Sequence, residues 1–342
     1  MRRSDSPDTD RRYPLRMPPD WDPPVPAWSS VFPQGAGQVS MCVIGCQHDA
    51  GQDVSGFVQD LSAIADDADI ADYASCEDRD GKRQTVGVLY WLGEDGCADW
   101  LESAEFRNFW EKHTADRTEF GVFREVFNIP FQRSETLFSG PEHHHGMSEA
   151  RMGITGPIKT HMYWGGMRDR IPHSADDPLE ASGAITVVEE QANRVRVRAH
   201  ENLCIIRSGQ DWSLTTDEQR REYVETMEPV LKDGMTFLRD SGDEVGCYSC
   251  RYMREFDEDG SKTDRTFGLA YFRTIGELEA WAEHHSTHLA IFNTFLEIAP
   301  RHGPDLQLRL WHEVSVLPSD RQFGEYVNCA PGTGLLGGLR SA

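Results

Sequence analysis

The segment from Ile275 to Ala299 combines residue types and spacing that could support chemistry. Its amphipathic pattern predicts one helix that opens with the capping box Thr274-x-x-Glu277 and is stopped by Pro300. One face of this helix carries, at spacings of four, three, four and three, Trp281, His285, His288, Phe292 and Phe295. A histidine on such a face is either a hydrogen-bonded core residue or an axial ligand that offers a nitrogen to haem iron. Position alone leaves both interpretations of His288 open, and His284 and His285 compete for the ligand role.

A second histidine interrupts an aliphatic strand. Alternation over residues 306–316 predicts a strand with one face formed by Leu306, Leu308, Leu310, His312, Val314 and Val316. A buried imidazole there either bonds to a backbone carbonyl or acts as a general acid in a dry cavity. Ser208 ends another predicted strand before Gly209, where serine is as readily a turn residue as a functional one. Because no Gly-x-Ser-x-Gly pattern is present, serine-based acyl transfer is not indicated.

Two more segments carry candidate ligands. His161 to Pro172 mixes aromatic residues, paired glycines and two arginines, a composition that suits a loop beside a planar ligand or a solvated turn. Pro141 to Gly146 contains His143, His144 and His145, but adjacent histidines do not converge on one metal from regular structure, so we expect an exposed loop. The sequence has no Walker loop and no Gly-x-Gly-x-x-Gly pattern, so nucleotide chemistry is not indicated.

The elements that must position these residues form a recognisable order. The second half predicts a strand over 202–208, a helix from a capping box at Thr216-x-x-Gln219 to about Leu238, strands over 245–253 and 266–272, then the histidine-bearing helix and the strand of His312. This β-α-β-β-α-β order is that of the split ferredoxin-like unit.

The first half is expected to repeat this unit. Thr85–Trp91 followed by Trp100 resembles Thr266–Phe272 followed by Trp281, and both pairs are 181 residues apart (266 − 85 and 281 − 100). We therefore predict an α+β class, a duplicated ferredoxin-like fold of the dimeric α+β barrel type with antiparallel sheets flanked by helices. The expected divisions are a Pro-rich N-terminal arm (1–35) and a single domain (36–342) made of two halves, about 36–195 and 196–342, with strands and loops of about 115–195 inserted between them.

The net charge of the chain argues against two classes of binding partner. The 34 Lys and Arg residues against 57 Asp and Glu residues give a net charge of −23, which repels nucleic acid and anionic lipid, so neither partner is expected. No apolar run approaches the roughly 18 residues of a membrane span, and the N-terminus lacks the apolar stretch of a signal peptide, so we expect a cytoplasmic protein. The eight scattered cysteines are expected as reduced thiols, and Cys247-x-x-Cys250 lacks the second ligand pair of a zinc site.

Six motifs, taken together and in one order, closely resemble those of the haem-dependent aldoxime dehydratases, bacterial enzymes that convert aldoximes into nitriles. The motifs are Tyr163-Trp-Gly-Gly-Met-Arg-Asp-Arg-Ile-Pro172, Ile206-Arg-Ser-Gly-Gln-Asp-Trp212, Val245-Gly-Cys-Tyr-Ser249, Ser286-Thr-His-Leu-Ala-Ile-Phe292, His312-Glu-Val-Ser-Val316 and Tyr326-Val-Asn-Cys-Ala-Pro-Gly-Thr-Gly334. The likeness runs from the Pro-rich arm almost to the C-terminus.

The resemblance implies a role for individual residues. His288 matches the family's proximal haem ligand, His312 its catalytic distal histidine, and Ser208 the serine that bonds the substrate oxygen. Arg170 matches the distal arginine, with Arg168 as the alternative. Glu135 matches a glutamate that assists the distal histidine, and His161 has a counterpart whose role stays open.

The implied activity is that of a nitrile-forming lyase with haem b. In the family's mechanism ferrous iron binds the oxime nitrogen, and the distal histidine protonates the leaving oxygen as a general acid. The partners expected are a small-molecule aldoxime and a second copy of the chain in a homodimer. The alternatives are another haem enzyme on a related barrel, of the peroxidase or chlorite-decomposing type, and a non-catalytic haem-binding sensor or carrier.

Overall fold

One antiparallel sheet organises the chain in this computed structural model, which describes residues 11–33, 37–93, 95–115, 120–142, 145–257 and 260–341. The strands of the sheet are β2 (Gln38–His48), β3 (Ile70–Glu77), β4 (Arg83–Trp91), β5 (Gly121–Pro130), β6 (Ser134–Phe138), β8 (Thr186–Gln191), β9 (Arg194–Arg198), β10 (Leu203–Asp211), β11 (Cys247–Phe256), β12 (Lys262–Phe272), β13 (Arg309–Leu317) and β14 (Gln322–Val327). Across these twelve strands the order is β6-β13-β10-β12-β11-β3-β4-β2-β5-β14-β9-β8. A separate pair joins β1 (Ser30–Val31) to β7 (Gly153–Ile154).

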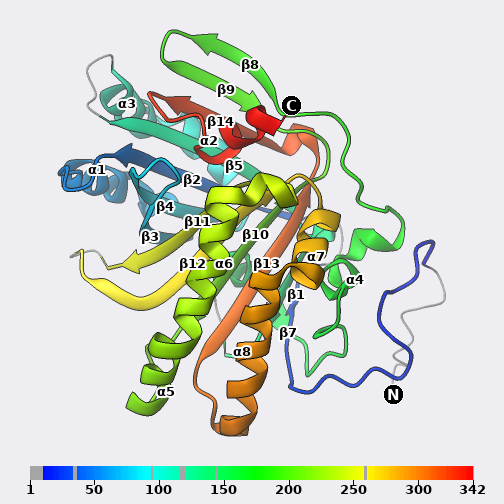
Figure 1. The fold of residues 1–342 in the computed structure, drawn as a ribbon. Helices are drawn as coiled ribbons and strands as arrows, with labels where there is room; N and C mark the ends of the chain where they lie inside the picture. The colour runs from blue at the N-terminus through cyan, green and yellow to red at the C-terminus, as the bar shows by residue number, and fades with distance from the viewer. Residues whose placement is uncertain are drawn as a thin grey trace.

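The helices flank this sheet in two groups (Figure 1). They are α1 (Ser55–Ile64), α2 (Gly96–Glu102), α3 (Ala104–Thr114), α4 (Gly166–Arg170), α5 (Asp217–Glu222), α6 (Glu228–Ser241), α7 (Ile275–His284) and α8 (Ser286–His302). The group α1 to α3 covers β2, β4 and β5, and α6 to α8 lie across β10 to β13 (Figure 1). None of the helices in the described part of the chain is long and apolar enough to cross a membrane.

The element order predicted for the second half is observed, namely β10, the helical segment α5 to α6, β11, β12, α7 with α8, and β13. Both capping boxes are confirmed on the threonine side, because Thr216 accepts from the Gln219 amide at 3.4 Å and Thr274 accepts from the Glu277 amide at 2.9 Å. At the level of a mixed fold with a large antiparallel sheet flanked by helices, the predicted class is confirmed.

Apolar side chains form layers on both faces of the sheet. One cluster lies between the sheet and α1 to α3, another between the sheet and α6 to α7, and a third is enclosed by the sheet itself. The enclosure follows from the curl of the sheet, which brings β13 near one end of the order against β5 of the other half. The site described below uses the helix-covered face of β10 and β13.

The prediction of one continuous helix over 275–299 was wrong. The chain leaves helical geometry at His285 (φ −79°, ψ 133°), which separates α7 from α8. The cause is local, because the His285 ring caps the new helix by accepting from the Thr287 amide. Pro300 does not stop the helix either, since α8 continues to His302. Pro300 lies in the last turn of α8, where it removes the amide donor of one helical hydrogen bond.

Two further expectations need correction. Residues 115–195 are not merely inserted between the halves, because β5 pairs along its whole length with β2 and β6 extends the second half by pairing with β13. The strand expected from Leu306 begins at Arg309, because its pairing with β10 begins at the pair Arg309–Asp211. Both errors arise where pairing with a distant strand, rather than local pattern, decides the structure.

A buried ion pair joins β5 to β11 inside the sheet. Glu125 on β5 and Arg251 on β11 form two hydrogen bonds of 2.7 and 2.9 Å, and both side chains are at most 3% exposed. Tyr271 and Tyr326 also donate to the Glu125 carboxylate, at 2.5 and 2.6 Å. The carboxylate is therefore the common acceptor of three buried donors.

We predict that Glu125→Ala lowers the free energy of unfolding by about 3 to 5 kcal/mol, because it leaves the Arg251 charge buried without a counter-ion. Urea denaturation of the purified variant measures the change. Glu111→Ala, which removes an exposed carboxylate, is the control. Equal stability of the two variants would contradict the prediction.

Candidate active site

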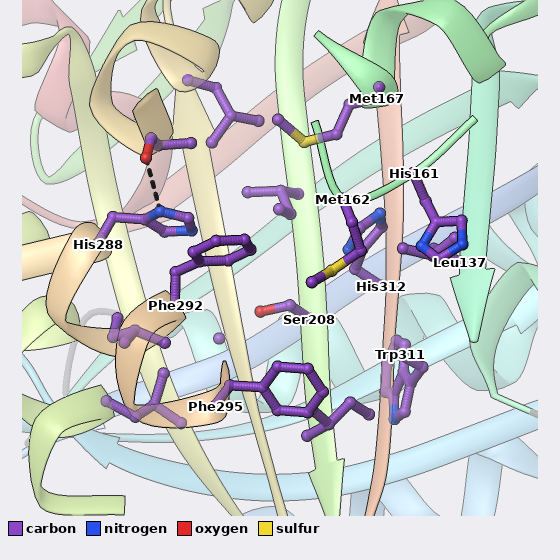
Figure 2. A pocket seen from close by; sticks show the side chains of 18 of the residues that line it. Leu137, His161, Met162, Met167, Ser208, His288, Phe292, Phe295, Trp311 and His312 are labelled. Atoms are coloured by element: carbon purple, nitrogen blue, oxygen red, sulfur yellow. Dashed lines mark hydrogen bonds between the residues drawn. The ribbon is translucent and has the colours of Figure 1, made fainter. Parts of the chain in front are cut away.

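A cavity of about 380 Å³ lies between helices α6 to α8 and strands β10, β12 and β13. Its helical wall is apolar and includes Leu231, Met235, Ile291, Phe292 and Phe295. The opposite wall carries polar groups from β10, β13 and the segment before α4, among them Ser208, His312, His161 and Arg170. Figure 2 shows this arrangement, with His288 on one side and Ser208 and His312 on the other.

His288 is the histidine that α8 presents to the cavity. Its Nδ1 donates to the carbonyl oxygen of Ala282 at 2.7 Å, a bond drawn in Figure 2. Because Nδ1 carries the proton, Nε2 keeps a free lone pair, and this nitrogen faces the cavity. Burial lowers the pKa of His288 to about 4 although the hydrogen bond opposes that shift, so the imidazole is neutral at pH 7. A neutral imidazole with a fixed tautomer is the form that binds metals.

The two rival histidines do not line the cavity. The ring of His285 stacks on Phe237 at a centroid distance of 4.0 Å, and its Nδ1 lies 2.9 Å from the Thr287 hydroxyl. The expectation that His285 shares the face of His288 was therefore wrong, because the helix break at His285 turns its ring away. His284 is exposed. Of the three candidates, only His288 contributes to the cavity lining.

Ser208 and His312 are direct neighbours across two strands. The antiparallel register of β10 and β13 pairs them, so both side chains point to the helix-covered face. Across the described residues the Ser208 hydroxyl has no hydrogen-bond partner, and it lies in the cavity (Figure 2). Gly268 faces Ser208 from β12, and a Cβ there would come within 3.6 Å of the serine oxygen. The site therefore holds a hydroxyl and an imidazole side by side.

Arg170 and Glu135 bind the same edge of the His312 ring. Arg170 donates to Glu135 Oε2 at 2.7 Å and to the Thr160 carbonyl at 2.6 Å, and its third contact places Nη2 3.0 Å from His312 Nε2. Glu135 Oε1 lies 3.0 Å from that same nitrogen. Burial alone would raise the pKa of Glu135, but the charges and hydrogen bonds of Arg170 and His312 outweigh it and hold the pKa below its usual value.

This geometry provides a partner for either protonation state of His312. When Nε2 is unprotonated, its lone pair accepts from Arg170, and Glu135 Oε1 is left without a donor. When Nε2 carries a proton, it can donate to the ionised Glu135. The other ring nitrogen, Nδ1, has no partner in the part of the chain that the structure describes. It is therefore the nitrogen left for a molecule in the cavity.

Arg168 is held elsewhere. It donates to Glu279 at 2.9 to 3.2 Å and to the carbonyl of Pro178. The structure thus places Arg170, and not Arg168, against His312 and Glu135. Of the histidine run, His143 and His144 lie outside the described residues, and the ring of His145 stacks on Trp311 at 4.9 Å and 7°.

Sequence reasoning missed part of the cavity lining. Met162 and Met167 border the polar side (Figure 2), and Val25, Pro26 and Ala27 of the N-terminal arm also line it. Met167 lies within the motif from Tyr163 to Pro172 and Met162 directly precedes it, so the motif was the signal that could have identified them. The arm residues carry no signal of their own, because only the folded chain brings them to the site.

The site fits a planar cofactor with a metal at its centre. His288 offers from an apolar wall one imidazole nitrogen, Nε2, that has no hydrogen-bond partner in the described ranges, and a bound aromatic ring system could pack on Phe292, Phe295 and Met235. The polar groups on the opposite wall are then left for a substrate. Groups of three or more His, Cys, Asp or Glu side chains that could hold a bare metal ion are absent from the described residues.

The chain is similar to known proteins over most of its length. The profile of a family described as haem-containing dehydratase matches residues 42–335. The aliphatic aldoxime dehydratase of Rhodococcus erythropolis is 36% identical over 330 residues, which cover 94% of this chain and 93% of that protein. The phenylacetaldoxime dehydratase of Bacillus sp. (strain OxB-1) is 34% identical over 332 residues, with the same coverage.

A solved structure is similar over nearly the whole fold. A crystal structure of an aldoxime dehydratase in complex with butyraldoxime superposes with a TM-score of 0.89 at 35% identity, covering 96% of this chain and 93% of that one. Another aldoxime dehydratase crystal structure gives a TM-score of 0.90 at 34% identity.

We predict a pH effect from His161, which is 1% exposed and whose buried Nε2 has no hydrogen-bond partner among the residues that the structure describes. Burial and the Arg170 charge lower its pKa to about 4. Between pH 6.5 and about 4 the unfolded chain therefore binds a proton that the folded chain does not, so stability falls as the pH falls.

His161→Leu should flatten this dependence, by on the order of 3 kcal/mol over the whole window. Urea denaturation at several pH values compares it with the parent protein and with His284→Leu, which removes an exposed histidine. An unchanged slope in His161→Leu would show that the assignment is wrong.

Proposed function

The chain belongs to the haem-containing dehydratase family, and from that premise we propose that it dehydrates aldoximes to nitriles in the cavity between α8 and the strands β10 and β13. One observation carries the proposal. A neutral histidine with a free Nε2 faces, across an apolar cavity, a hydroxyl and an imidazole that share one strand pair. The histidine on the helical wall suits an axial ligand of haem iron. The hydroxyl and the imidazole on the opposite wall suit a substrate that loses water.

The residues present fit haem b. His288 would hold the iron through Nε2, while its hydrogen bond to Ala282 fixes the ring and raises its strength as a ligand. Ferrous haem, when bound, supplies an iron that takes the oxime nitrogen and electron density that weakens the N–O bond. The apolar helical wall excludes water from this space, which strengthens the electrostatic interactions of the polar groups opposite.

The polar residues would donate and accept the protons that the reaction moves. Dehydration of R–CH=N–OH breaks the N–O bond and the aldehydic C–H bond and releases nitrile and water, so the departing oxygen must gain a proton. In doubly protonated His312, Nε2–H can donate to Glu135 and Nδ1–H is left for the substrate oxygen. Ser208 is adjacent and can donate a hydrogen bond to the same oxygen. After His312 gives up the Nδ1 proton, the lone pair on that nitrogen can accept the proton from carbon.

Arg170 and Glu135 have a positioning role in this proposal. The lowered pKa of Glu135 keeps its carboxylate ionised, so that Oε1 can accept a hydrogen bond from Nε2–H of His312. Arg170 holds that carboxylate in place by donating to its other oxygen, Oε2, at 2.7 Å. The pair therefore keeps Nε2–H of His312 bonded to Glu135 while Nδ1 gives up and regains its proton during one turnover.

We predict that His312→Ala retains haem and binds aldoxime but loses turnover by at least ~10²–10⁴, the range that general acid help supplies. Nitrile is measured by gas chromatography after reduction with dithionite, with butyraldoxime and phenylacetaldoxime as substrates. His173→Ala, outside the cavity, is the control. Undiminished nitrile production by His312→Ala would remove this residue from the mechanism.

His288→Ala should instead lose haem, because the ligand that faces the cavity is gone. The haem content per chain, from the absorption spectrum of the purified protein, measures this. A matched variant is His285→Ala, which removes the neighbouring ring that lies outside the cavity lining. Retention of haem in His288→Ala with loss in His285→Ala would exchange the two assignments.

The same assay separates the alternatives. Peroxide turnover above aldoxime turnover would favour a peroxidase-type enzyme, and haem binding without turnover of any aldoxime would favour a sensor or carrier. The cavity contains a hydroxyl and a ring nitrogen that have no protein partner in the described part of the chain. Such polar groups favour an enzyme over a passive carrier.

We also propose the finer organisation of the chain. The order of both halves supports two ferredoxin-like units, because β3-β4-β2-β5 and β11-β12-β10-β13 place corresponding strands in corresponding positions and β11 joins β3. The division into an arm (1–35) and a domain of two halves (36–195 and 196–342), the homodimer and the cytoplasmic location belong to the same proposal. Light scattering of the purified protein tests the homodimer.

A further inference from the structure

The N-terminal arm, which the structure describes over residues 11–33, runs beside α4 and β7 (Figure 1). Its strongest attachment is to Asp169, the residue between Arg168 and Arg170. The Asp169 carboxylate accepts from the backbone amide of Arg16 at 2.8 and 3.0 Å and from that of Met17 at 3.0 Å. Tyr163 donates to the same carboxylate at 2.7 Å. Asp169 is 7% exposed, so a buried charge holds two successive amides of the arm.

The surroundings are shaped for this attachment. Gly165 has a φ of +99°, and a Cβ there would lie 2.4 Å from the Cδ of Arg16. The Arg16 side chain thus crosses directly over the glycine and reaches Glu279 on α7 at 3.1 Å. Further along the arm, the Trp21 indole donates to the carbonyl of His161 at 2.9 Å. The arm is therefore tied to the same segment that carries His161 and Arg170.

The other end of the arm is tied to the edge of the sheet. β6 is the first strand in the sheet order, so one of its edges is free of any other sheet strand. Trp28 pairs with Phe138 of β6 through two backbone hydrogen bonds of 2.9 and 3.0 Å. β6 also carries Glu135, and Leu137 lies directly opposite His312. The arm thus covers the strand that positions the acid-base residues.

Between these two attachments the arm forms part of the cavity wall. Val25, Pro26 and Ala27 line the cavity, together with Leu137 and Phe138 of β6. Ala27 is 5% exposed, and its carbonyl accepts from the Ile158 amide at 2.9 Å, which fixes its position. An apolar wall beside the polar groups is where the carbon chain of an aldoxime would lie once its oxime group reached His312 and Ser208.

From these contacts we infer that the N-terminal arm is the wall that limits the substrate's carbon chain, with Ala27 as a specificity-determining residue and Asp169 as the positioning residue that holds the arm. This inference rests on the proposed function. It concerns the length and bulk of the group attached to the oxime carbon, not the dehydration step.

The first test enlarges the wall. Ala27→Leu adds apolar volume to the cavity lining, and Ala27→Gly removes a methyl group. The kcat/KM of each variant is measured with linear aldoximes from two to eight carbons. For Ala27→Leu we expect roughly 10- to 200-fold lower values with the longest chains and little change with the shortest, the range that one methylene is worth in an apolar pocket. Equal losses at every chain length, with haem content unchanged, would overturn the inference.

The second test releases the arm. Asp169→Asn keeps the size of the side chain but loses the charge and one oxygen acceptor. We expect trypsin to cut the Arg16–Met17 bond roughly tenfold faster in the holoenzyme of this variant. The amides of Arg16 and Met17 lose their charged acceptor, so the arm opens more often. The preference among chain lengths should weaken in parallel. Asp176→Asn neutralises an exposed carboxylate nearby and is the matched control.

Measurements of aldoxime binding, which require no turnover, distinguish this inference from the proposed function. Titration of wild type and Ala27→Leu with the same aldoximes, followed by calorimetry, reports the chain-length limit without turnover. If wild type makes no nitrile yet Ala27→Leu selectively loses binding of long chains, the proposed reaction is refuted, whereas the role of the arm in limiting the carbon chain is supported. If cleavage at Arg16 and chain-length preference are both unchanged in Asp169→Asn, the positioning role of Asp169 is refuted.

Discussion

The hydrogen bond from His288 Nδ1 to the carbonyl of Ala282 is the interaction on which the site depends. The carbonyl is available because α7 ends at His284 and the last carbonyls of a helix have no partner within it. The same break starts α8 at a new angle, which brings His288 against Trp281 and Trp164 with its Nε2 directed into the cavity. One interruption of a helix therefore supplies the ligand nitrogen, the tautomer and the direction of the ring.

The cavity exists because small residues occupy the strand face beneath that helix. Ser208, Gly268 and Ala270 face α6 and α8 on neighbouring strands. Elsewhere on the sheet, the space between the strands β2, β4 and β5 and the helices α1 to α3 is filled by Trp91, Trp100, Phe106 and Trp110. On the opposite face of the same two strands, Arg207 lies across from Glu313, and both side chains bond to Tyr90. Contacts on both faces of the sheet therefore fix the register that aligns Ser208 with His312.

The sequence predicted what local pattern determines. Period-two alternation placed His312 on the apolar face of its strand, helical spacing placed His288 towards the core, and both capping boxes marked true helix starts. It did not predict the break at His285, because a side-chain cap competes there with a pattern that is equally helical on both sides. It left Arg168 and Arg170 as alternatives, since both lie in one short helix and only their distant partners, Glu279 and Glu135, distinguish them. The contribution of the arm to the cavity depends on contacts across more than 100 residues of chain, such as that of Arg16 with Asp169.

A crystal structure of the haem-loaded chain, with an aldoxime soaked into reduced crystals, tests the central claim most directly. The account predicts iron bonded to Nε2 of His288, the Nδ1 bond to Ala282 intact, and the oxime oxygen within hydrogen-bond distance of Ser208 and His312. Iron bonded to any other histidine, or haem with its open coordination position turned away from Ser208 and His312, would contradict it.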